Sequence, residues 1–409
     1  MIAKWKRALL RFLKNPLFPG FYLPSFLFAV AWGVRIPVMP LFAHELTPDY
    51  RLVGLIVAGG GLGTLLADLP LGNLIRRMDK RTAMILGLAI DGISTLALVW
   101  VGSIWLAVLL RFFAGIGHAI FSIARHTFIT NVTRADLRGR AISTLEGTLR
   151  IGLFLGPALG GWLAVMFGLR LPFMVFAFIC ATSIAAIAFS KKDVGVRPET
   201  LPRVEGDSVG LRGALKGRTR TFAMVSIGHL LAQITRAGEG LILPLWATDV
   251  LNLSPDQIGL AVSLISAVSI LLFYPVGLLM DRVGRKVAIV PSFFTLALGL
   301  GLLPLTRGFG GLLLVAAVVG LGYALGTGAL MTIGADLSPK RGRSAFLSAW
   351  QWIGDAGSSG GPLIVGWVAQ ALALPLAALA IAGASLLAGG VFAFLIPETL
   401  KDRSRINFH

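Results

Sequence analysis

Twelve long apolar stretches, separated by short segments rich in charge, proline or glycine, dominate this chain of 409 residues. A bilayer core of roughly 30 Å is crossed by a helix of about 20 apolar residues, so each stretch predicts one membrane-spanning helix. The predicted spans are residues 20–43, 52–75, 83–102, 105–127, 141–165, 171–189, 221–247, 257–280, 287–305, 311–334, 344–369 and 376–396. The sequence therefore predicts an all-α integral membrane protein with 12 transmembrane helices.

The composition excludes an ordinary soluble globular protein. Hydrophobic residues make up 56% of the chain and charged residues only 14%, against about 25% charged in a typical soluble domain. The net charge of +18 raises the question of nucleic-acid binding, but the basic residues lie in short runs between apolar stretches. That distribution is typical of loops that orient a membrane protein, so we expect no nucleic-acid partner.

The basic residues also predict the orientation of the chain. If the N-terminus is cytoplasmic, 29 of the 37 lysines and arginines fall on the cytoplasmic side and only Arg51, Arg170 and Arg307 fall outside. Cytoplasmic segments of membrane proteins carry an excess of Lys and Arg. We therefore expect a multi-pass protein of the cytoplasmic (inner) membrane with both termini in the cytoplasm.

The spans divide into two halves that repeat. The only long polar segment, residues 190–220, separates six spans from six, and Gly54 and Pro70 recur as Gly259 and Pro275 at an offset of 205. Parallel six-helix repeats with a site between them are a known transporter plan. The predicted division is a basic interfacial segment 1–19, an N-terminal six-helix bundle 20–189, a cytoplasmic linker 190–220, a C-terminal six-helix bundle 221–396 and a cytoplasmic tail 397–409.

A charged motif follows the eighth span. It contains, in order and at fixed spacing, Gly277, Asp281, Arg282, Gly284, Arg285 and Lys286. This motif resembles the loop signature G-x-x-x-D-R-x-G-R-K of the major facilitator superfamily. A carboxylate at a helix end beside a glycine turn and cations can act as a latch that breaks and re-forms. In the first half, Arg76 replaces the aspartate and Asp79 replaces the second glycine, so the matching latch is degraded there.

Further motifs carry the same resemblance. Arg111 begins an R-x-x-x-G-x-G element in the fourth span, and Pro37 to Pro40 resemble the P-V-x-P element of twelve-span drug:proton antiporters. The fifth span carries the small-residue motif associated with the superfamily's antiporters, made of Gly152, Gly156, Pro157, Gly160 and Gly161. Small residues four apart let helices approach closely. The resemblance implies the major facilitator fold and favours export, although a near copy of the motif from Gly357 shows that it also belongs to the repeat.

Charged residues within the spans are the candidates for substrate and proton binding, because an intramembrane charge is costly unless it faces protein or water. They are Arg35, Asp68, Asp91, Arg111, Arg125, Glu146, Arg150, Arg236, Glu239 and Asp355. Arg35, Arg236 and Glu239 lie in the first and seventh spans, which line the cavity in the parallel-repeat plan, and are our first choice. Arg111, Asp68 and Glu146 are further candidates. We expect Asp91 and Asp355 near the membrane interfaces.

The sequence favours a secondary active transporter over an enzyme. It holds no H-E-x-x-H, G-x-S-x-G, Asp-rich or ATP-binding motif, and its single cysteine, Cys180, permits no intramolecular disulfide or multi-cysteine metal site. We expect no cofactor and no metal, and as partners a small-molecule substrate, protons and the lipid bilayer, with the protein a monomer. Proton-coupled efflux of drug-like or amphipathic compounds is the leading prediction. Proton-coupled uptake or efflux of a sugar or other small metabolite, lipid translocation and a transporter-like sensor stay open.

Overall fold

The computed structural model describes residues 17–133, 137–190, 213, 215, 219–326, 328–339 and 341–400, with side chains placed for all of these except 69–77, 138, 140 and 344. Most of the predicted basic segment 1–19, of the linker 190–220 and of the tail 397–409 lies outside the described residues. Within the described residues, every regular element is a helix. This confirms the predicted all-α fold.

The first half of the chain forms six spanning helices. They are α2 (Leu23–Leu46, preceded by the short turn η1, Phe18–Tyr22), α3 (Tyr50–Arg77), α4 (Lys80–Ala97, extended by η2, Leu98–Trp100), α5 (Ile104–Val132), α6 (Arg138–Phe167) and α7 (Leu171–Phe189). Each corresponds to one predicted span.

The second half repeats the pattern with one break. Its elements are α9 (Thr219–Asp249), α10 (Pro255–Arg282), α11 (Lys286–Leu302, extended by η3, Leu303–Leu305), α12 (Gly308–Gly326), α13 (Ala329–Leu337), α14 (Arg343–Ala371) and α15 (Leu374–Gly390, extended by η4, Val391–Leu395). The tenth predicted span is split between α12 and α13, where Gly328 has a φ of +78°. Glycine adopts this left-handed conformation without steric cost, and it interrupts the helix.

Apolar length explains most of these helices. In the described part of the chain, ten helical segments are long and apolar enough to cross a membrane. The two other spanning-length helices, α9 with 31 residues and α14 with 29, are not among those ten. Both pack against helices of the first half, α14 on α3 and α9 on α2.

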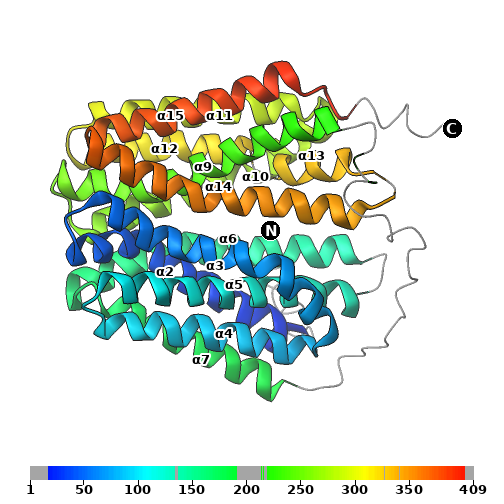
Figure 1. The fold of residues 1–409 in the computed structure, drawn as a ribbon, viewed down its shortest axis with the longest axis horizontal. Helices are drawn as coiled ribbons and strands as arrows, with labels where there is room; N and C mark the ends of the chain where they lie inside the picture. The colour runs from blue at the N-terminus through cyan, green and yellow to red at the C-terminus, as the bar shows by residue number, and fades with distance from the viewer. Residues whose placement is uncertain are drawn as a thin grey trace, which may run out of the picture.

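The two halves lie side by side, and two helix pairs make most of the contact between them. In Figure 1, α2 to α7 form the lower bundle and α9 to α15 the upper one. Across the interface α3 packs on α14, and α6 packs on α10. We use "linker end" for the end at which α7 stops and α9 starts, on the right of Figure 1, and "distal end" for the opposite one.

The two interfaces are built alike, as the offset of 205 predicts. A Cβ added to Gly54 on α3 would lie 2.5 Å from the carbonyl oxygen of Pro362 on α14. At the repeat-related positions, a Cβ on Gly259 of α10 would lie 2.3 Å from the carbonyl oxygen of Pro157 on α6. Glycine at these two places allows the backbones of opposite halves to touch.

Polar contacts join the halves at the distal end. The Tyr50 hydroxyl donates to Asp249 Oδ2 over 2.7 Å, and the Tyr50 N–H donates to Gln370 Oε1 over 2.9 Å. His44 Nε2 lies 3.4 Å from the same Asp249 oxygen. Because His44 and Tyr50 belong to the first half and Asp249 and Gln370 to the second, these contacts hold the distal end closed.

Removing the Asp249 charge is expected to loosen that closure. In Asp249→Asn, the Tyr50 hydrogen bond weakens and the His44 contact loses its charge, so the ratio of distal-open to distal-closed molecules rises about fivefold. Spin labels at the exposed distal positions Trp100 and Leu305, in a Cys180→Ser background, measure this ratio. Asp256→Asn is the control, because within the described residues that carboxylate accepts a hydrogen bond from Ser254 of its own helix start and none from the first half. If the distance distribution in Asp249→Asn is unchanged, the contacts of Asp249 do not hold the distal end closed.

Candidate functional site

A cavity of about 360 Å³ lies between the two halves. Residues of α2, α6, α9, α10 and α12 line it, so neither half forms it alone. Its charged lining residues are Arg150 on α6 and Arg236 and Glu239 on α9. Apolar side chains, together with Tyr323, Ser266 and Ser269, make up most of the remaining wall.

Glu239 is held at the cavity by a tyrosine. The Tyr323 hydroxyl on α12 donates a hydrogen bond to Glu239 Oε2 over 2.9 Å. The guanidinium carbon of Arg236 lies 5.5 Å from the centre of the Tyr323 ring. The spacing of Arg236 and Glu239, three residues apart on α9, places both side chains on the cavity, as helix geometry predicts.

Arg35 lies apart from this pair. Its Nη1 is 2.9 Å from Asp91 Oδ1 on α4 and 3.2 Å from the Thr95 hydroxyl, and its guanidinium carbon lies 4.7 Å from the centre of the Trp32 ring. Asp91 is completely buried, on a helix of the first half. The structure brings together Arg236 and Glu239 but places Arg35, the third of our first choices, inside the first bundle.

Arg111 is buried in the same bundle. Its Nε and Nη1 atoms have no hydrogen-bond partner among the described residues, and a Cβ on Gly60 of α3 would lie 2.5 Å from its Nη2. It is close enough to Arg35 and Asp91 for their charges to act on it. Arg111 therefore belongs to the Arg35–Asp91 cluster and is not among the residues that line the cavity.

Two further candidate acids have different surroundings. Glu146 lies on α6 one turn from Arg150, and its charge acts on Arg150 and on Arg125. Asp68 on α3 lies next to Asp355 on α14, across the interface of the two halves, so each carboxyl group acts on the other.

Two residues that lie beside the predicted candidates, Tyr323 and Asp355, were not selected as site residues from the sequence. Tyr323 carries no charge and stands alone in an apolar span, so no sequence signal marks it. For Asp355, the repeat in the sequence offers a signal that could have identified it. The offset of 205 relates Asp68 to Phe273 and Arg150 to Asp355. The repeat therefore relates two contacts across the halves, Asp68 with Asp355 and Phe273 with Arg150, whose guanidinium carbon lies 4.3 Å from the Phe273 ring centre.

The fifth-span motif packs on both neighbours of α6. Cβ atoms on Gly152, Gly156 and Gly160 would each lie within 2.6 Å of an atom of α2. On the other side, a Cβ on Gly161 would lie 2.3 Å from the carbonyl oxygen of Pro255, at the start of α10. The motif thus joins α6 to its own bundle and to the opposite half.

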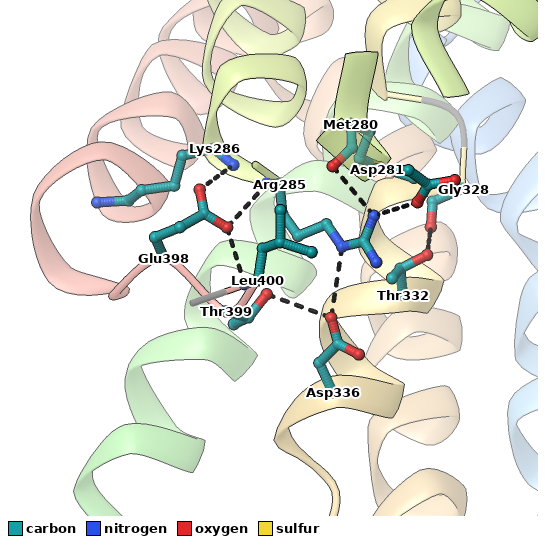
Figure 2. A network of polar contacts seen from close by, with 10 residues as sticks. All are labelled: Met280, Asp281, Arg285, Lys286, Gly328, Thr332, Asp336, Glu398, Thr399 and Leu400. Atoms are coloured by element: carbon teal, nitrogen blue, oxygen red, sulfur yellow. Dashed lines mark hydrogen bonds and ion pairs between the residues drawn. The ribbon is translucent and has the colours of Figure 1, made fainter. Parts of the chain in front are cut away.

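The motif after the eighth span forms a network of polar contacts (Figure 2). Arg285 Nη1 lies 2.6 Å from Asp281 Oδ1 and donates to the Met280 carbonyl, while Arg285 Nε lies 3.4 Å from Asp336 Oδ2 on α13. Gly284 has a φ of +144° and faces the Glu398 carboxylate. All the contacts drawn in Figure 2 lie within the second half.

The rest of this motif lies nearby. Gly277 has open space around it, Arg282 is exposed, and Lys286 Nζ donates to the Ala393 carbonyl over 2.6 Å. The repeat-related Arg81 likewise donates to the carbonyl of Ile187 at the end of α7. In both halves, a basic side chain therefore ties the start of the third helix to the last helix of the same bundle.

Glu398 caps the start of α11. Its carboxylate accepts the N–H groups of Arg285 over 2.8 Å and of Lys286 over 3.0 Å. Partial burial acts to raise the pKa of Glu398, but hydrogen bonds from three backbone N–H groups and the charge of Arg285 hold it below its ordinary value. A carboxylate at a helix N-terminus is also favoured by the helix dipole.

Glu398→Gln is expected to destabilise the protein by about 1 kcal/mol near neutral pH. Because the folded-state pKa is lowered, this contribution is complete above the unfolded pKa and disappears as the pH falls through the folded value. Thermal melting of wild type and variant over a pH series measures it, and the two curves should converge in acid. A constant difference in melting temperature across that range would show that the carboxylate charge has no role.

Comparisons with known proteins agree with this architecture. A model of the Major Facilitator Superfamily matches residues 21–224 and again 225–409. A bacterial homologue of the human lysosomal transporter Spinster has a similar fold, with a TM-score of 0.74, 15% identity and coverage of 93% of this chain and 96% of its own.

Three relatives show the range of names in the family. An uncharacterised MFS-type transporter of Methanocaldococcus jannaschii is 23% identical, covering 76% of this chain and 80% of its own length. The chromaffin granule amine transporter of Rattus norvegicus is 26% identical, with 86% and 67% covered. Multidrug resistance protein 1 of Bacillus subtilis is 26% identical, with 50% and 51% covered. With both halves matched by the family model, this chain is a transporter of the major facilitator superfamily.

Proposed function

We propose that the protein is a proton-coupled antiporter that exports amphipathic small molecules across the cytoplasmic membrane, with both termini in the cytoplasm. The observation that carries the proposal is the position of Glu239 in the cavity between the two halves. Among the residues that line the cavity it is the only carboxyl group, and it lies where the two halves meet. A titratable group at this place is accessible in turn from each side of the membrane as the halves rock.

The proposed cycle uses competition for Glu239. In the ionised state its carboxylate accepts the Tyr323 hydroxyl and attracts a substrate. When a proton binds, the negative charge is lost and the attraction to the substrate weakens. A site that holds either a proton or a substrate exchanges one for the other, and the proton gradient then drives export.

Two observations favour export over uptake. The motif from Gly152 to Gly161 resembles the antiporter element, and it joins α6 to α2 and, through Gly161, to α10 of the opposite half. Some relatives are named multidrug resistance proteins. Orientation rests on the basic residues of the linker-end segments, which the positive-inside rule places in the cytoplasm.

Proton flux in proteoliposomes tests this function. Liposomes with an acidified lumen and a trapped pH dye receive a panel of cationic, anionic and zwitterionic amphipathic compounds and sugars. We expect substrate-induced proton exit in wild type and its loss in Glu239→Gln. Glu45→Gln, an exposed acid at the end of α2, is the matched control and should behave as wild type.

The other outcomes are equally informative. Proton movement in the same direction as the compound would replace antiport by symport and favour the uptake of a metabolite. Compound-driven proton exit that persists in Glu239→Gln would remove this residue from the coupling step.

A further inference from the structure

The charges of the cavity do not balance. Two guanidinium groups, those of Arg150 and Arg236, line it with one carboxylate, Glu239. An unbalanced positive charge in a partly apolar cavity is costly unless an anionic group comes to meet it. The excess of one positive charge therefore points to an anionic group on the substrate.

The two guanidinium groups are free to bind a ligand. Neither Arg150 nor Arg236 makes a hydrogen bond or an ion pair within 4.0 Å to another described residue, and the Nε atom of each is buried without a partner. They line the same cavity from opposite halves, near enough for the charge of Arg236 to act on Arg150. Glu146, one turn from Arg150, is the nearest acid on the same helix and forms no ion pair with it among the described residues.

Aromatic rings orient both groups. The Arg150 guanidinium carbon lies 4.3 Å from the centre of the Phe273 ring, and that of Arg236 lies 5.5 Å from the centre of the Tyr323 ring. Contact with a ring face leaves the N–H groups in the guanidinium plane available for oxygen atoms. A carboxylate or similar anion between the two planes would be bound by one arginine from each half.

Glu239 provides a negative charge for a positively charged group on the substrate. Its carboxylate lines the same cavity as the two arginines and already accepts the Tyr323 hydroxyl. An ammonium group on the substrate would pair with it and would compete with a proton there. The rest of the wall is mostly apolar, with Ile36, Leu153 and Ile265 among its members, and matches a hydrophobic body.

From this arrangement, we propose that the cavity binds zwitterionic amphipathic molecules, with the anionic group between Arg150 and Arg236 and the ammonium group at Glu239. The inference rests on the proposed antiport function, because the ammonium group takes the place of the proton. It also specifies the substrate class, because an exporter of purely cationic or neutral compounds would not prefer zwitterions.

Three probes separate the two charges of such a molecule. Nε-dansyl-L-lysine is a zwitterion with a fluorescent apolar body, its methyl ester lacks the anionic group, and its Nα-acetyl derivative lacks the ammonium group. We expect purified wild-type protein to bind the zwitterion about tenfold or more tightly than either derivative, as measured by dansyl fluorescence. In Arg236→Gln and in Arg150→Gln, the zwitterion should bind no better than the ester, while the affinity for the ester stays within about twofold of wild type.

Controls separate this inference from the proposed function and from misfolding. Arg307→Gln removes an exposed arginine outside the cavity and should keep the wild-type preference. Unchanged affinity of the ester for the arginine variants shows that they are folded. Equal affinity of wild type for all three probes, including no measurable binding of any, or a preference for the ester, overturns the substrate class. Either result leaves antiport through Glu239 to be decided by the proton-flux assay.

Discussion

Gly156→Val is expected to prevent the first bundle from assembling. A Cβ at residue 156 would lie 2.5 Å from the Val30 carbonyl oxygen and 2.6 Å from the Gly33 Cα, both of which belong to the backbone of α2. Backbone atoms cannot move away unless the two helices separate along their contact, and membrane helices associate mainly through such close packing. The yield of monodisperse protein in size-exclusion chromatography should fall about tenfold or more.

The same helix provides the control for this substitution. Gly147 lies on α6, and an added Cβ would meet nothing within 4 Å there. Gly147→Val introduces the same β-branched residue with the same helix propensity but no clash, so its yield should stay close to wild type. Similar losses in both variants would mean that helix propensity, and not the contact with α2, determines the outcome.

Asp91→Ala is expected to cause the second large loss. It leaves the guanidinium of Arg35, a residue that is 5% exposed, without its charged partner and with the positive charge of Arg111 nearby. Removing one member of a buried ion pair costs about 3–5 kcal/mol, because the remaining charge stays buried. A fall in melting temperature, measured in the same detergent for all variants, reports the loss.

A double substitution tests whether the unpaired charge of Arg35 causes this loss of stability. In Arg35→Met with Asp91→Leu no charge of the pair is left, so the double variant should be more stable than Asp91→Ala alone. If the double variant is as unstable as the single one, the effect comes from packing around α2 and α4. Glu45→Ala, at an exposed acid of α2, should leave the melting temperature unchanged.

The arrangement of the helices follows from the sequence because the membrane leaves few alternatives. Every predicted apolar stretch except the tenth became one helix, since a spanning segment must satisfy its own backbone hydrogen bonds. The break at Gly328 was not predicted, because an apolar stretch has the same hydropathy whether or not a glycine in it adopts a positive φ. The offset of 205 predicted contacts as well as sequence matches, as Gly54 and Gly259 show.

The candidate site was only partly predictable for a different reason. Arg236 and Glu239 share a helix turn, so local geometry places them together. Arg35 and Asp91 are 56 residues apart, and no local spacing indicates that they pair. Helix packing decides that Arg236 faces the cavity and that Arg35 does not. The sequence alone does not specify how the helices pack.

Proton release on substrate binding tests the central claim most directly. Purified protein in weakly buffered detergent solution receives the compound that drives the largest proton flux in proteoliposomes, and a pH dye records the protons set free. If substrate and proton compete for Glu239, wild type releases protons as the compound binds, Glu239→Gln binds the compound with no release, and Glu45→Gln matches wild type. Proton release by Glu239→Gln equal to that of wild type would contradict the account.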